Sequence, residues 1–114
     1  MKIIYNNIIP FKGFSAINLF GIIFARKGTF ISFRVKNHEA IHTAQMKELL
    51  FIGFYLWYIL EWLILLVKFR FNNSKAYNSI SFEKEAYDKM YDPDYLKSRK
   101  SFSFINYLKP KNYA

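Results

Sequence analysis

The sequence predicts a mainly α-helical chain with a small β-hairpin, an α+β fold organised around one long helix. Three observations support this prediction. Residues 1–33 hold short apolar runs separated by turn residues, which favours a β element. Residues 34–70 form the long helix, which runs into an apolar segment, and residues 79–91 form a second helix. A basic, aromatic tail of residues 92–114 completes the chain, whose length suits one domain with a modest core.

The β element is expected to be a hairpin. Residues 1–18 favour extended segments and turns over a helix, and residues 19–25 have the apolar composition of a buried strand. Residues 26–29 then supply a turn, and residues 30–33 a short return strand.

The long helix carries both histidines of the chain in the pattern His38-Glu39-x-x-His42. Ser32 and Asn37 are both acceptable N-caps for it. Four residues apart, the two imidazoles project from one helix face and can hold one zinc ion, with positions left for a third ligand and a water molecule. Glu39 would lie beside that ion without binding it, where a carboxylate can take a proton from the water.

The alternative to a metal site is a polar helical turn with two solvated histidines. Against it, a chain with only two histidines places them at ligand spacing, with a glutamate in the position of a base. Gln45 continues the same face, either as a hydrogen-bond partner near the site or as an ordinary satisfied polar residue. The chain has no cysteine, which excludes disulfides, thiolate zinc sites and cysteine nucleophiles, so a third protein ligand has to be Asp or Glu.

Residues 49–67 form an apolar run of nineteen residues whose only charge is Glu61. Such a run is long enough to span a bilayer at the short end of the usual range, and it also fits a helix buried on all sides. Glu61 lies on the same helical stripe as Phe54 and Trp57. It marks either a basic partner or an internal polar network, or else a helix that is not fully embedded.

The composition points to a membrane as a partner. Thirteen Phe and nine Tyr are more large rings than so short a chain can bury, and the net charge is +9. These features favour an anionic membrane surface, and nucleic acid is an unlikely partner because no nucleic-acid-binding motif is present.

The second helix follows a polar connection at residues 71–78, with its turn at 72–74. Ser79 or Ser81 caps this helix, and Asp92-Pro93-Asp94 ends it. The tail beyond it is either an interfacial segment or packing that covers the rest of the chain.

The stretch from Val35 to His42 resembles the active-site helix of zinc metallopeptidases of the zincin group, although Lys36 stands where those sequences usually have an uncharged residue. Farther along, Glu83-x-x-Ala86 is similar to the Glu-x-x-Ala-Asp element of several membrane-embedded zinc peptidases, which makes the resemblance gluzincin-like.

This resemblance implies that Glu83 is the third metal ligand, with Glu85 pointing away from the metal. Tyr87 stands where the families have Asp, and it is the first candidate for a hydrogen-bond donor to the site and to a developing oxyanion. The alternative is that Glu83 and Glu85 are both solvated surface charges.

The implied function is a zinc-dependent metallopeptidase that acts on a peptide or protein substrate. In zincins a strand beside the active-site helix pairs with the substrate, so one of the segments 19–25 and 30–33 is the expected edge, unless the hairpin only covers the core. Two other functions stay open: a non-catalytic membrane protein whose apolar helix packs with partners, and a zinc-binding but inactive domain.

A continuous helix from His42 to Val67 would advance about 37 Å and carry the chain away from the metal site. Three solutions are open: the helix bends near Gly53, it lies along a membrane surface or in a core, or Glu83 is not the ligand. We expect a membrane-associated arrangement that does not span the bilayer.

Overall fold

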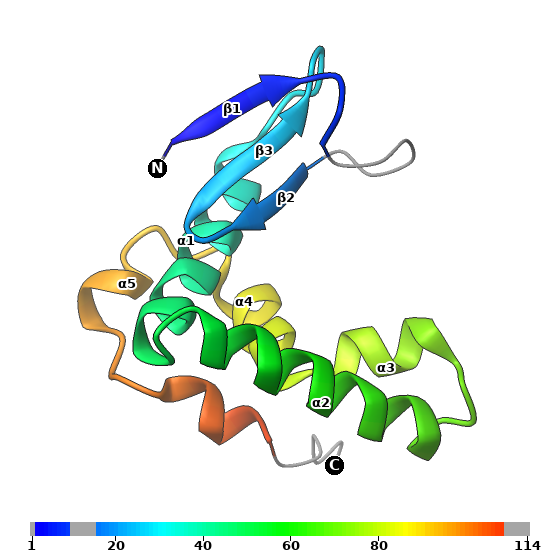
Figure 1. Cartoon of the computed structure of the whole chain (residues 1–114). Helices are drawn as coiled ribbons and strands as arrows, with labels where there is room; N and C mark the ends of the chain where they lie inside the picture. The colour runs from blue at the N-terminus through cyan, green and yellow to red at the C-terminus, as the bar shows by residue number, and fades with distance from the viewer. Residues whose placement is uncertain (1, 10–15, 109–114) are drawn as a thin grey trace.

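The structure is a computed structural model that describes residues 2–9 and 16–108. Within them, a three-stranded sheet is followed by helices, so the predicted α+β class with a small β element is confirmed. Figure 1 shows the sheet at the top and the helices below it. The strands are β1 (Ile3–Asn6), β2 (Ala16–Leu19) and β3 (Ile22–Arg26), in the spatial order β1-β3-β2.

A hairpin is present, but the strand boundaries predicted for it are wrong. β2 and β3 are antiparallel and are joined by Phe20 and Gly21, whose φ angles of 52° and 90° are both positive, as a tight two-residue turn requires. The predicted strand 19–25 therefore contains the turn itself. The return strand 30–33 does not form, because Ser32 caps the first helix by accepting a hydrogen bond from the Val35 N–H.

The predicted helix 34–70 is two helices, α1 (Phe33–Glu48) and α2 (Ile52–Lys68). They meet at an angle of 108° across a short break. Leu50 and Phe51 have φ angles of 56° and 62° in this break, and the Phe51 N–H bonds to the Met46 carbonyl, which ends α1. The chain therefore changes direction just before Gly53, at Leu50 and Phe51, two residue types that rarely adopt positive φ.

Of the three solutions for the path of the chain, the structure shows the first, a bend near Gly53. Because α2 folds away from the axis of α1, the chain returns to His38 and His42 without a long extended segment. In the part of the chain that the structure describes, no single helix is both long and apolar enough to cross a membrane. The bent pair passes that test only when both helices are taken together.

The chain after α2 contains more helix than predicted. The segment 71–78, predicted as a polar connection, is mostly α3 (Asn73–Ser79), capped by the side chain of Asn72. The predicted helix 79–91 is α4 (Ser81–Lys89). In the expected tail, residues 95–98 form α5 (Tyr95–Ser98) and residues 103–107 form the 3₁₀ helix η1 (Ser103–Tyr107). Residues 109–114 lie outside the described part of the chain.

Glu61 is in an internal polar network, one of its three predicted environments. Its carboxylate accepts hydrogen bonds from the Ser81 N–H at 2.6 Å and the Ser81 hydroxyl at 2.7 Å, and from the Trp57 indole at 3.2 Å. It therefore supplies the first turn of α4 with the acceptor and negative charge that a helix N-terminus favours. The predicted cap by Ser79 or Ser81 is wrong, because Ile80 is the N-cap residue of α4 and no side chain makes a cap hydrogen bond there.

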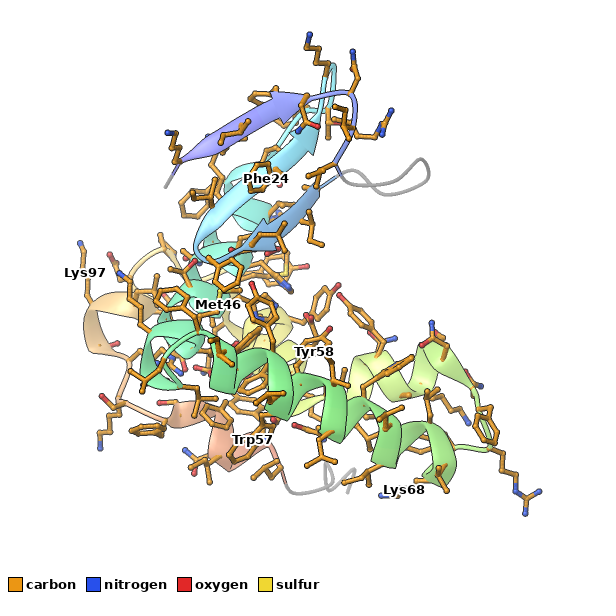
Figure 2. All side chains as sticks on the ribbon, viewed as in Figure 1. Phe24, Met46, Trp57, Tyr58, Lys68 and Lys97 are labelled. Carbon is orange, nitrogen blue, oxygen red and sulfur yellow. The ribbon has the colours of Figure 1, made fainter. Side chains whose placement is uncertain are left out.

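Aromatic side chains fill the core between α1, α2, α4 and η1. Phe82 is fully buried, with ring centroids 4.5 Å from Phe54 and 4.6 Å from Phe104, and Met46 completes the cluster. Figure 2 shows Trp57 on the lower side of α2, where it meets Phe104 of η1, and Tyr58 on the opposite side. The tail therefore covers the core, one of the two roles left open for it, and α4 is held beside α1.

Candidate metal centre

The side chains of His38, His42 and Glu83 converge on one point. Glu83 Oε1 lies 3.2 Å from His38 Nε2 and 3.0 Å from His42 Nε2, and the two imidazole nitrogens are 3.1 Å apart. The two histidines are one turn apart on the same face of α1, and Glu83 comes from the first turn of α4. The bend between α1 and α2 thus brings together residues that are more than forty positions apart.

All three side chains are buried, so the alternative of two solvated histidines is wrong. Relative exposure is 7% for His38, 5% for His42 and 5% for Glu83. A tetrahedral zinc ion places neighbouring nitrogen and oxygen ligands about 3.3 Å apart, close to the spacing found here. Two imidazoles and a carboxylate are also a donor set that zinc accepts, so the residues present fit that ion.

The charges at this point are tightly coupled. Burial alone would lower the pKa of His42, but the charge of Glu83 and its hydrogen bond outweigh burial and raise that pKa to about 9. Burial would raise the pKa of Glu83, yet the two histidines hold it far below its usual range. A proton and a metal ion thus compete for the same nitrogen, as is usual for ligands that must be deprotonated to bind.

Glu39 lies beside the cluster and is not one of the converging ligands. Burial raises the pKa of its carboxyl group, and the neighbouring histidines only partly offset this effect. A carboxylate with a raised pKa is closer to the range in which it can both accept and release a proton near neutral pH. Its backbone carbonyl accepts a hydrogen bond from Asn18, which joins β2 to α1 at the site.

Gln45 fixes the orientation of His42. The amide nitrogen of Gln45 donates to the Phe82 carbonyl and to Glu85 Oε1, so its oxygen is left to accept from His42 Nδ1 at 2.8 Å. The proton of neutral His42 is therefore on Nδ1, and the lone pair of Nε2 points to the cluster.

Glu85 faces away from the cluster, and the alternative in which Glu83 and Glu85 are both surface charges is wrong. Glu85 is fully buried and accepts hydrogen bonds from Arg99 Nε at 2.6 Å and from Tyr95 at 2.5 Å. Arg99 also pairs with Glu48 at the end of α1. The buried ion pair with Arg99 therefore holds Glu85 in place. Glu85 accepts a hydrogen bond from Gln45, and Gln45 in turn orients His42.

Three tyrosines surround the cluster. Tyr87, singled out from the sequence, packs its ring edge-on against His38 with centroids 4.4 Å apart, and its hydroxyl lies 3.0 Å from that of Tyr77. The hydroxyl that donates to Glu83 Oε2, at 2.8 Å, belongs to Tyr58 of α2. Sequence reasoning missed Tyr58 and Tyr77. A polar signal was present at Tyr58, because its hydroxyl interrupts the apolar run three residues before Glu61.

A cleft of about 380 Å³ opens onto the cluster. Asn18 and its neighbours in β2 form one wall, and residues of α1, α2, α3 and α4 form the others. The lining includes Ile17, Asn18, His38, Glu39, His42, Tyr55, Tyr58, Tyr77 and Glu83. A larger cleft of about 500 Å³ lies between α2, α3 and α4 and contains none of the converging ligands.

The strand that borders the site is β2, and neither of the predicted edge segments is correct. β3 is paired on both sides, so it offers no free edge, whereas β2 is at the edge of the described sheet. The hydroxyl of Tyr55 donates to the Asn18 carbonyl at 3.3 Å and accepts from the Phe20 N–H at 3.0 Å, which joins this edge to α2.

Comparisons of the chain with protein-family models, with curated proteins and with solved structures found no match.

Proposed function

We propose that this protein is a zinc-dependent metallopeptidase. The observation that supports the proposal most directly is the convergence of His38, His42 and Glu83 at a buried point that a cleft reaches from outside. Glu39 lies at the same cleft, beside the ligands and outside their set.

In this proposal His38, His42 and Glu83 hold the ion, and Tyr58 and Gln45 fix the orientation of Glu83 and His42. Zinc, when bound, supplies the positive charge that acidifies a water molecule and polarises a peptide carbonyl. Glu39 accepts the proton of that water and passes it to the leaving amine, a task suited to a carboxyl group of raised pKa. Tyr77 lines the cleft and shares a hydrogen bond with Tyr87, so these are the phenols to test as donors to the reacting carbonyl oxygen.

The cleft suits an extended peptide. Its wall at β2 is a strand edge, and the backbone groups of this edge that do not already bond to the Tyr55 hydroxyl would pair with a substrate whatever its side chains. The apolar residue Ile17 and the rings of Tyr55 and Tyr58 would then contact the substrate side chains.

Zinc content and peptidase activity together test the proposal. Purified protein should carry one zinc ion per chain by elemental analysis and cleave peptides from a random library read by mass spectrometry. Glu39→Gln should keep the zinc and lose cleavage, because an amide cannot accept the proton. His38→Ala should lose both.

Two substitutions on α4 provide a matched pair. Glu83→Gln should weaken zinc binding strongly, whereas Asp88→Asn, the same chemical change at an exposed residue of the same helix, should leave it unchanged. Zinc binding without cleavage in every library would identify an inactive zinc-binding domain. Absence of zinc from both the wild type and His38→Ala would favour the non-catalytic membrane protein.

A further inference from the structure

One face of α2 is apolar and exposed along the whole helix. Residues on the opposite face, such as Phe54 and Tyr58, pack toward the core and the metal centre. The exposed side chains range from 47% exposure at Leu63 to 68% at Val67. We call this surface the α2 face, and it consists of Leu56, Ile59, Leu60, Leu63, Ile64 and Val67.

The apolar surface continues past both ends of α2. Phe20, 59% exposed, extends it onto the β2–β3 turn, where its ring lies 5.3 Å from that of Tyr55. Phe71, 76% exposed, extends it beyond the C-terminus of the helix. An apolar surface of this length is unusual on a protein that stands alone in water, so a partner is expected to cover it.

The basic residues near the α2 face indicate which kind of partner covers it. Lys47 is exposed in the last turn of α1, before the break that leads into α2, and Lys68 and Arg70 are exposed at the far end of α2, where Figure 2 shows Lys68. The larger cleft beside this end is lined by Lys68, Lys75 and Lys84. A second copy would place cations against cations in either direction of pairing and would join two chains of net charge +9. An anionic lipid surface complements both the apolar face and its basic ends.

We propose that the α2 face binds the surface of an anionic membrane, with α2 lying in the plane of the interface. The helix cannot be surrounded by lipid, because its other face is packed against α3, α4 and η1. Its seventeen residues extend about 26 Å along the membrane, and the exposed side chains reach into the boundary between head groups and acyl chains.

The geometry places the metal centre at the border of this surface. Tyr55 and Tyr58 line the metal-site cleft, and the residues that directly follow them, Leu56 and Ile59, are on the α2 face. If the proposed peptidase function holds, the substrates are peptide segments next to a membrane surface, since those are the segments that reach this cleft when α2 is bound.

Vesicle binding tests the membrane surface independently of catalysis. Glu39→Gln protein should float with vesicles that contain phosphatidylglycerol and bind vesicles of phosphatidylcholine alone much more weakly. The double substitution Leu60→Gln and Ile64→Gln should weaken binding by roughly tenfold or more. The control is Phe30→Gln, which removes a side chain 87% exposed in the β3–α1 loop and should leave binding unchanged.

Three results would overturn the proposal. The first is equal binding by Glu39→Gln protein with and without the double substitution, and the second is no binding of folded Glu39→Gln protein to anionic vesicles. The third is a dimer in the absence of lipid that the double variant converts to a monomer, because a second copy would then cover the α2 face. Circular dichroism and unchanged zinc content verify that the double variant is folded.

A peptide from the active library, with and without a lipid anchor, tests the substrate class. On anionic vesicles the wild type should cleave the anchored peptide faster than the free one, and the double variant should lose this preference while cleaving the free peptide normally. Equal rates for the wild type would contradict the substrate class alone. Absence of any cleavage, with vesicle binding intact, would contradict the proposed function and leave the membrane surface established.

Discussion

At the scale of single residues, Gln45 connects the metal centre to the C-terminal segment. Its amide is held at one side by His42 Nδ1 and at the other by Glu85 and the Phe82 carbonyl. A hydrogen bond to the far nitrogen of a histidine that could bind a metal determines which ring nitrogen faces the metal position and how rigidly it does so.

Gln45→Met keeps the approximate size of the side chain and removes its three hydrogen bonds, to His42, the Phe82 carbonyl and Glu85. We expect zinc affinity, measured by competition with a chromophoric chelator, to fall about 10-fold to 100-fold. Above about pH 9, where His42 is neutral in the metal-free protein, nitrogen NMR shifts should show His42 exchanging between tautomers in the variant, whereas the wild type holds one. Unchanged affinity and an unchanged tautomer would show that Gln45 plays no part in positioning His42.

The raised pKa of His42 makes the metal-free protein sensitive to pH. In the folded state this pKa is about 9, against about 6.5 for a histidine in an unfolded chain. The folded state therefore holds the proton more tightly, and the resulting stability is fully present below pH 6.5 and is lost as the pH rises through about 9.

Urea unfolding in a chelator, followed from pH 6 to pH 9.5, measures this effect. The free energy of unfolding of the wild type should fall across the interval, and Glu83→Gln should remove most of the fall because Glu83 is the main group that raises this pKa. A wild-type profile as flat as that of Glu83→Gln would contradict the assigned coupling.

At the scale of elements, the C-terminal segment locks α1 to α4. Arg99, after α5, pairs with Glu85 of α4 and Glu48 of α1, and its side chain is 4% exposed. Removing one partner of a buried ion pair leaves an uncompensated charge, which costs about 3–5 kcal/mol.

Arg99→Ala should therefore lower the free energy of unfolding by about that amount, measured in urea at neutral pH. Lys97→Ala is the matched control, because the ion pair of Lys97 with Asp94 is solvent-exposed, and an exposed pair contributes less than about 1 kcal/mol. Similar losses of unfolding free energy in the two variants would show that the Arg99 ion pairs with Glu48 and Glu85 do not join α1 to α4.

The sequence predicted the type of each major element better than its boundaries. The helix with His38 and His42 was predictable because the two histidines are one helical turn apart and a serine cap precedes them. The hairpin was predictable, but Gly21 and Gly28 are both turn residues, and the local pattern favours a turn at Gly28 whereas β2 and β3 turn at Gly21. The break at Leu50 and Phe51 left no local signal, since both residues are unfavourable at positive φ. Phe51 packs against the core, whereas Leu50 is 82% exposed.

The candidate site was predicted unevenly for a similar reason. His38, Glu39 and His42 form a motif within five residues, whereas Glu83 was named only through a resemblance. The contacts of Gln45 with Glu85, and of Tyr58 with Glu83, depend on the path of the whole chain. That path could not be derived from local patterns in the sequence, because none of them indicates the angle between α1 and α2.

At the scale of the whole molecule, the bend between α1 and α2 determines three properties together. It brings α4 to α1, so that Glu83 meets the histidines. It forms a cleft between β2 and α2, and the Tyr55 hydroxyl joins these two elements. It also leaves one apolar side of α2 exposed, which accounts for much of the hydrophobic composition that the small core does not bury.

Anomalous X-ray scattering at the zinc edge, from crystals grown with zinc, tests the central claim most directly. The account predicts one strong peak about 2.0–2.2 Å from His38 Nε2, His42 Nε2 and a carboxylate oxygen of Glu83, with Glu85 still paired to Arg99. A crystal without a peak at this point, or with zinc bound by other residues, would contradict it.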